Sequence, residues 1–311
     1  MKKALIASTI LATLGGAAYA ETGVNISGFG RFGLQYNSEA GDGEASTVIH
    51  TRLRFNIDAK TETDTGVTFG GRIRLQDQSG YSSTAVSSAL LYATYEGLRV
   101  EVGNVNTALD SVELFYDSEM GLIDSSYGDS RSDFYSFSTG HYNAERMGIY
   151  ASYTVGGFTG RLSYVDPNQY DDSSIGYNSE TSLALTYSAG AFTVAAAGTW
   201  DGAGIEGNDI FFIGGAYKVS DVATVGLNYI DEGEDGAGGD LDKTIVIYGN
   251  YTMDALTLKG YISHNGLDSL ETNTGLGIGA DYDLGGAKLT GSIQRDYNKE
   301  TYADVGVRFD F

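Results

Sequence analysis

Apolar and polar residues alternate with a period of two along most of this chain. In residues 50–60, apolar positions 51, 53, 55, 57 and 59 alternate with polar ones, and in the first such segment Val24, Ile26, Phe32, Leu34 and Tyr36 share one phase. A period of two places the two sets on opposite faces of a β-strand. The pattern therefore predicts strands of about ten residues with one apolar and one polar face.

Short turns separate these segments at regular intervals. Seven turns are predicted, at Asp64-Thr65-Gly66, Glu96-Gly97, Gly156-Gly157, Ala189-Gly190, Ser220-Asp221, Met253-Asp254 and Gly285-Gly286. Each turn joins two strands, and one further strand at either end, starting near Val24 and ending at Phe311, brings the expected number to sixteen. The opposite ends of the strands carry longer polar connections, and the longest runs from Asn104 to Ala144.

This arrangement is typical of an all-β fold, a sixteen-stranded antiparallel transmembrane β-barrel. No stretch after residue 20 has 18 consecutive apolar residues, so the membrane would be crossed by strands. A tyrosine precedes six of the turns and would form an interfacial girdle: Tyr95, Tyr153, Tyr187, Tyr217, Tyr251 and Tyr282. A soluble β-sandwich explains many tyrosines but not their fixed offset. The lumen of such a wide barrel is an aqueous channel.

The N-terminus has the three regions of a secretion signal in order. Lys2 and Lys3 precede a mostly apolar run from Ala4 to Leu14, and the small residues Ala18 and Ala20 flank Tyr19. We expect cleavage after Ala20, which leaves a barrel domain over residues 21–311.

Composition narrows the possible partners. The chain has 0 Cys, so no disulfide or cysteine-bound metal stabilises it. Without residues 1–20 it would lose two basic residues and no acidic ones, for a net charge of about −24. Nucleic-acid binding needs a basic face and is therefore not expected.

Candidate pore residues follow from the phase of the strands. Five arginines fall on the polar phase of the first three strands and should point side by side into the lumen: Arg31, Arg52, Arg54, Arg72 and Arg74. Arg146 and Arg161 are weaker candidates on inward phases. Such a group needs water or carboxylates to screen it, although a solvated wall without a selective role is the alternative for each arginine.

The whole chain from residue 21 resembles the sixteen-stranded general porins of Gram-negative bacteria, in particular the Rhodobacter-type porins of alphaproteobacteria. The features that carry the resemblance are the strand with Val24-Asn25-Ile26-Ser27-Gly28, the segment Glu101-Val102-Gly103-Asn104 before an exceptionally long third loop, and the last strand Ala303 to Phe311. The resemblance implies an outer-membrane location, contact with membrane lipid and lipopolysaccharide, a homotrimer, and recognition of Phe311 by the barrel-assembly machinery. Relatives bind calcium near the pore mouth, so calcium is an option without named ligands.

In that family the third loop folds into the barrel and presents acidic residues to a basic wall. Its motif is Pro-Glu-Phe-Gly-Gly-Asp, and Glu113-Leu114-Phe115-Tyr116-Asp117 corresponds to it without the proline and glycines. The resemblance thus assigns Glu113 and Asp117 to the constriction, with Asp110, Glu119 and Asp124 as neighbours. Together with Asp129, these carboxylates would screen the arginines and set up a field across the pore.

The expected function is passive diffusion of ions and small hydrophilic solutes, with a weak preference for cations. A substrate-specific channel for a sugar or an anion is the main alternative, although no ladder of inward aromatic residues accompanies Phe29. An outer-membrane enzyme is a further alternative. It finds little support, because there are three histidines and no Gly-x-Ser-x-Gly motif.

Overall fold

The structure is a computed structural model that describes residues 23–41, 43–139, 146–170 and 176–311. The expected signal peptide, residues 1–20, lies outside the described residues. Within the described residues there is no helix long and apolar enough to cross a membrane.

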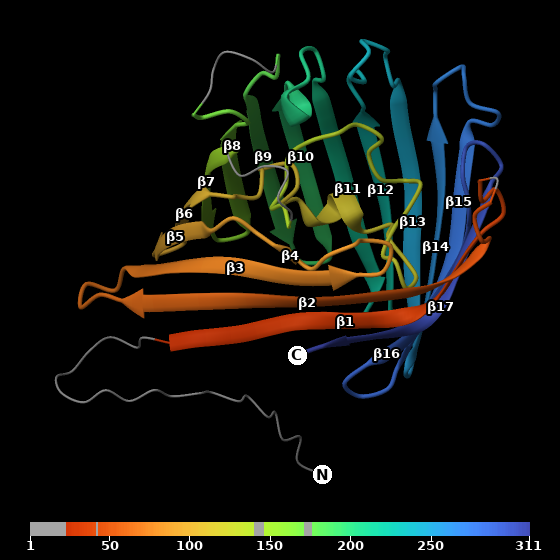
Figure 1. Cartoon of the computed structure of the whole chain (residues 1–311), viewed down its shortest axis with the longest axis horizontal. Helices are drawn as coiled ribbons and strands as arrows, with labels where there is room; N and C mark the ends of the chain where they lie inside the picture. The colour runs from red at the N-terminus through yellow and green to blue at the C-terminus, as the bar shows by residue number, and fades with distance from the viewer. Residues whose placement is uncertain (1–22, 42, 140–145, 171–175) are drawn as a thin grey trace.

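Antiparallel strands make up nearly all of the regular structure (Figure 1). Among the described residues, short 3₁₀ turns interrupt them at η1 (Glu113–Tyr116) and η3 (Gly202–Gly204). The strands are β1 (Gly23–Asn37), β2 (Thr47–Glu62), β3 (Thr68–Gln78), β4 (Ala85–Val86), β5 (Leu90–Tyr95), β6 (Leu98–Gly103), β7 (Met147–Val155), β8 (Phe158–Asp166), β9 (Glu180–Ala189), β10 (Phe192–Trp200), β11 (Ile210–Ser220), β12 (Ala223–Asp231), β13 (Lys243–Met253), β14 (Leu256–Asn265), β15 (Thr274–Asp283), β16 (Lys288–Arg295) and β17 (Thr301–Asp310).

The sheet closes on itself as a barrel of sixteen positions. Strands that follow each other in the chain pair, with β5 pairing with β3 past the short β4, and β1 pairs with both β2 and β17. β4 pairs with β3 at Leu75↔Val86, and β5 continues alongside the same strand, so β4 and β5 together occupy one position. Closure leaves no free sheet edge, which a membrane would not tolerate. The predicted fold class is confirmed.

The apolar phase of each strand lies on the outside of the barrel. In β1 the exposed side chains include Val24, Ile26, Phe32 and Leu34. The six turn-flanking tyrosines are also exposed, from 40% for Tyr187 to 50% for Tyr153. Their rings therefore lie on the lipid side, near the short-turn end of the barrel, as a girdle requires.

The two ends of the barrel chain are joined to each other. Gly28 and Phe311 exchange backbone hydrogen bonds of 2.8 and 3.0 Å, and the Phe311 ring lies 5.2 Å from that of Phe55. The first and last strands thus form a continuous seam, which also supports part of the pore lining.

Candidate functional site: the third loop and the basic wall

The described part of the third loop, residues 104–139, runs inside the barrel (Figure 1). Its first part is fixed to the wall by backbone amides: Ala108 N donates to Ser163 Oγ at 2.9 Å and Leu109 N to Ser182 Oγ at 3.0 Å. Inward hydroxyls on β8 and β9 therefore replace the water that these loop amides would otherwise need.

Apolar burial holds the next part of the loop. Leu109, Val112, Leu114 and Phe115 are all buried and form one cluster with inward residues of β9–β12, namely Ala184, Ala195, Ala197, Ile210, Phe212 and Ile230. Burying a large apolar side chain is worth roughly 1.5–3 kcal/mol. This cluster is therefore the main attachment of η1 to the wall.

The two acidic residues assigned by the family motif lie at the two ends of η1. Glu113 is exposed at its start, and Asp117 follows its end and accepts a hydrogen bond from the Tyr248 hydroxyl at 3.3 Å. Asp110 accepts one from the Tyr116 hydroxyl at 2.7 Å. Burial raises the pKa of both Asp110 and Asp117.

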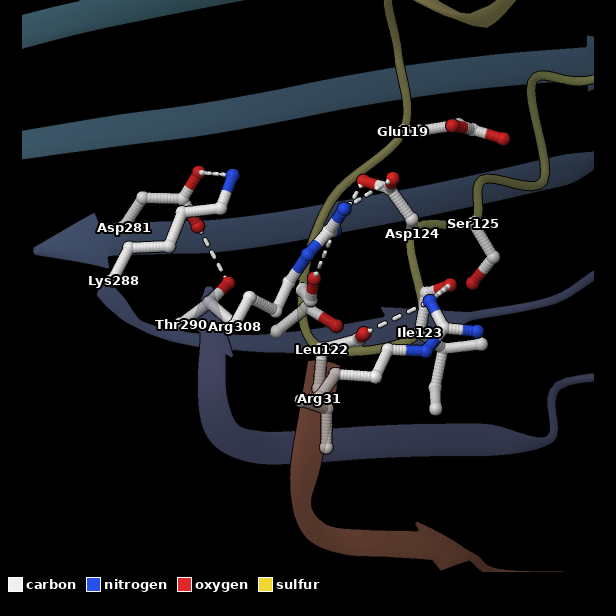
Figure 2. A network of polar contacts seen from close by, with 12 residues as sticks. Arg31, Glu119, Leu122, Ile123, Asp124, Ser125, Asp281, Lys288, Thr290 and Arg308 are labelled. Atoms are coloured by element: carbon white, nitrogen blue, oxygen red, sulfur yellow. Dashed lines mark hydrogen bonds and ion pairs between the residues drawn. The ribbon is translucent and has the colours of Figure 1, made fainter. Parts of the chain in front are cut away.

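The tip of the loop, residues 120–125, reaches the seam between β1 and β17 (Figure 2). Met120 and Ser125 pair across the tip. Asp124 forms an ion pair with Arg308, and Arg31 donates to the carbonyl oxygens of Leu122 and Ile123. The tip is thus attached to the opposite side of the barrel from the apolar cluster.

Two buried carboxylates attach the returning part of the loop. Glu232 Oε2, at the end of β12, accepts hydrogen bonds from Ser130 Oγ at 2.6 Å and from Arg131 N at 2.9 Å. Glu180 Oε2, in β9, accepts from Tyr135 N at 2.7 Å. Because hydrogen bonds to charged groups are strong ones, these contacts hold the loop on the long-loop side of the lumen.

The five predicted arginines do form one wall. Strand register places Arg31 opposite Arg52 and Phe29 opposite Arg54, while Arg72 and Arg74 lie opposite Asp58 and Asn56. Residues opposed in register point to the same face of the sheet. The basic wall is therefore Arg31, Arg52, Arg54, Arg72 and Arg74, on β1–β3.

Neutral side chains provide several of the contacts that the guanidinium groups of the basic wall make. Gln76 Oε1 accepts from Arg52 Nη2 at 2.8 Å and from Arg54 Nε at 2.7 Å. The Phe29 ring lies between three guanidinium groups, 4.9 Å from that of Arg54, 5.6 Å from Arg52 and 5.8 Å from Arg31. Cation–π attraction partly offsets the mutual repulsion of these like charges.

Only Arg72 of this wall forms an ion pair within the described parts of the chain, with Asp58 at 2.8 Å. The loop carboxylates were predicted to screen the arginines of the basic wall directly. Among the described residues, Asp124 is the one loop carboxylate that forms an ion pair, and its partner is Arg308 on β17. Asp110, Glu113, Asp117, Glu119 and Asp129 form no ion pair among the residues that the structure describes. Asp129 instead accepts from Ser118 and Ser126.

Sequence reasoning missed a second group of charges beside the tip. Asp281 lies 3.4 Å from Lys259 Nζ and 3.5 Å from Lys288 Nζ, and Arg308 lies opposite Lys288 in register. The signal was present, because Arg308 falls on the polar phase of the last strand. Glu119, beside this group, is largely buried, and burial together with the Asp129 and Asp124 carboxylates raises its pKa to about 9.

The weaker candidates, Arg146 and Arg161, make hydrogen bonds that hold the loop base and the barrel wall. Arg146 donates to Asn104 Oδ1 at 3.0 Å and to the Ser136 carbonyl, and so closes the base of the third loop. Arg161 donates to Thr186 Oγ1 at 2.8 Å, on β8 and β9. Over the described residues, no group of three or more His, Asp or Glu side chains is placed to hold a metal ion.

Comparisons with known proteins agree with this geometry. A family model described as Gram-negative porin matches residues 7–301. A porin of Fuscovulum blasticum is 45% identical over 296 residues, which cover 93% of this chain and 100% of that porin. A porin of Rhodobacter capsulatus is 27% identical over 319 residues, with the same coverage of 93% and 100%.

Solved structures give the same result. A variant of the Rh. blastica porin, in which a lysine and an arginine are replaced by alanine, superposes with a TM-score of 0.87 at 44% identity, over 93% of this chain and 100% of that one. A variant of that porin with an aspartate and a glutamate replaced by alanine gives 0.87 at 43% identity, with the same coverage.

A closed antiparallel barrel with an apolar outside, a polar lumen and a loop folded inward defines a transmembrane diffusion channel. With the family model matched over most of its length and 45% identity to a known porin, the chain belongs to the Gram-negative porin family. It is an outer-membrane general diffusion porin, a channel rather than an enzyme.

Proposed function

We propose that ions and small hydrophilic solutes are selected where the third loop faces the basic wall. The observation that carries the proposal is the asymmetry of the two sides. Arg31, Arg52, Arg54 and Arg74 lie on one wall without a carboxylate partner among the described residues, while Glu113 is exposed on the loop. Positive charge on one side and negative charge on the other produce a field across the water-filled pore.

Such a field acts on water before it acts on the solute. Water dipoles align between the basic wall and the loop, and an uncharged apolar molecule must displace that ordered water without replacing its interactions. A dipolar or charged solute aligns with the field instead. Passage is therefore passive, limited by size and favourable for polar solutes, and it requires no dedicated binding site.

We further propose a weak preference for cations. The acidic residues Asp110, Glu113 and Asp117 line the loop, and the chain has 41 acidic against 19 basic residues. An anion-specific pore would require the arginines to act unopposed. A sugar-specific pore would require accessible inward aromatic rings, whereas the inward rings of Tyr248 and Tyr261 are buried beneath the loop and Phe29 lies between guanidinium groups.

Assembly as a homotrimer is part of the proposal, and strand length supports it. β5 and β6 contain six residues each, about 20 Å at 3.3 Å per residue, before any tilt is considered. The apolar band of such barrels is about 25 Å tall. A second copy of this chain would cover the short strands β5 and β6 better than lipid would. Outer-membrane lipid, lipopolysaccharide and, through Phe311, the assembly machinery are the other proposed partners.

Planar-bilayer recording of the purified protein tests the selection mechanism. Reversal potentials in a salt gradient would be compared for the wild type, Arg52→Ala/Arg54→Ala and the control Lys299→Ala, which removes an exposed positive charge from the loop between β16 and β17. We expect weak cation preference in the wild type and in the control, and stronger preference with larger conductance in the double variant. An unchanged reversal potential in the double variant contradicts selection by the basic wall. Saturable block by one solute class favours a substrate-specific channel.

A further inference from the structure

Leu122, at the tip of the third loop, is completely buried although it lies inside an aqueous channel. Its side chain fills a socket that two glycines leave open. A Cβ on Gly33 would lie 2.8 Å from Leu122 Cδ2, and a Cβ on Gly306 would lie 2.9 Å from Leu122 Cδ1. Gly33 and Gly306 are opposite each other in the pairing of β1 with β17. The socket is therefore a feature of the seam and belongs to neither strand alone.

Polar contacts around the socket come from the same two strands. Leu122 N donates to Asp304 Oδ1 at 2.9 Å, and Ile123 N lies 3.4 Å from Asp304 Oδ2. Arg31 Nη1 donates to Leu122 O at 3.2 Å and to Ile123 O at 2.5 Å (Figure 2). Asp304 is on β17 and Arg31 is on β1. The backbone of the tip is thus satisfied only where these strands are paired.

We infer that Leu122 is the positioning residue that fixes the tip of the third loop, and with it the width of the pore. Because the socket is made by the first and the last strand, the loop tip docks only after the barrel has closed. The inference rests on the proposed constriction, since it concerns the loop that forms one side of it. Leu122 sets the position of the loop, and closure of the barrel is the folding step that must come before that position is reached.

The neighbouring Ile123 provides a matched control. It shares the same backbone contacts, yet its side chain is half-buried and lines a small cavity with Gln35, Ser292 and Tyr302 instead of filling the socket. Substitution of the glycines is a poorer test. A Cβ on Gly33 would also lie 2.1 Å from the Val305 carbonyl, and one on Gly306 would lie 2.3 Å from that of Phe32, so the strand pairing itself would suffer.

The first test is single-channel recording of Leu122→Ser, Leu122→Met and Ile123→Ser. We expect Leu122→Ser to raise both conductance and open-channel noise, Leu122→Met to restore the wild-type trace because it conserves volume, and Ile123→Ser to resemble the wild type. The thermal unfolding midpoint of the barrel should be the same in all three, which separates loop positioning from a general loss of stability. A Leu122→Ser trace that matches that of Ile123→Ser overturns the inference.

The second test follows the order of events. The chain has 0 Cys, so Leu122→Cys introduces a single thiol. During refolding in detergent, barrel closure would be followed by the mobility of unheated samples on SDS gels, and thiol exposure by pulses of a charged methanethiosulfonate reagent. We expect protection of the thiol, by about tenfold or more in modification rate, to appear with or after closure. Protection before closure, or none in the closed barrel, overturns the inference.

The two proposals fail separately. If the basic wall does not select ions, the reversal potential of Arg52→Ala/Arg54→Ala is unchanged, while Leu122→Ser still alters conductance and noise. If the socket is wrong, Leu122→Ser is silent, while the arginine variants still change ion preference.

Discussion

Asp124 and Arg308 form a two-point ion pair between the tip of the third loop and the last strand, with 2.6 Å between Asp124 Oδ1 and Arg308 Nη1 and 2.7 Å between Oδ2 and Nη2. Burial by itself raises the pKa of Asp124, but the hydrogen bond and charge of Arg308 outweigh it and leave the pKa below its ordinary value. Asp124 also has a positive φ of 62°, a conformation that costs energy in a non-glycine residue. The ion pair offsets this strain at the tip.

Asp124→Asn should loosen the tip. Because the pair is partly exposed, we expect a loss of about 1 kcal/mol, which raises the detached fraction of the loop roughly fivefold. Single-channel noise should increase, most clearly at low salt. Asp235→Asn, in an exposed loop, is the control. Equal noise in the two variants would show that the pair does not hold the tip.

Ion preference should depend on pH through Glu119. Burial and neighbouring carboxylates raise the pKa of Glu119 to about 9. The side chain is therefore neutral at pH 7 and gains one negative charge as the pH rises through about 9. The reversal potential should shift toward stronger cation preference between pH 8 and 10.

Glu119→Gln should abolish that step, whereas Glu113→Gln, on the exposed part of the same loop, should retain it. A pH step of equal size in Glu119→Gln would assign the titration to another group.

Glu232→Ala should release the returning part of the third loop. Its Oε1 accepts from Thr244 Oγ1 at 2.5 Å, and its Oε2 accepts from Ser130, Arg131 and Ser132. Leaving these buried donors without an acceptor should cost about 3 kcal/mol. A lower thermal unfolding midpoint in detergent and faster proteolysis of the loop are the expected results. Glu206→Ala, at an exposed position, should leave both unchanged.

Gln76→Glu should relieve the repulsion within the basic wall. The new carboxylate would lie 2.8 Å from Arg52 Nη2 and 2.7 Å from Arg54 Nε, with nearly the same shape as the native amide. We expect the variant to fold normally and to have a stronger cation preference that declines as salt is raised. Gln169→Glu, exposed in the loop that follows β8, carries the same charge change outside the pore. A matching shift in both variants would indicate a general surface-charge effect.

The apolar attachment of the third loop shows where sequence reasoning failed. Inward positions of a pore were expected to be polar, yet Ala195, Phe212 and Ile230 point inward and are buried. These breaks in the alternation mark where the loop covers the wall. A single strand pattern does not reveal this, because an inward apolar residue is explained only by the segment that lies on it, and that segment is far away in the sequence.

The sequence by itself determined the strands, their number and which residues face the lumen, because a period of two depends only on neighbouring residues. It therefore placed the five arginines on one wall. Only the tertiary structure decided which charges meet. Asp124 pairs with Arg308 on the last strand, and Leu122 fits against Gly33 and Gly306, which are neighbours in the seam but lie near opposite ends of the chain. Such contacts have no period along the chain, since they exist only after closure of the barrel has brought the first and last strands together.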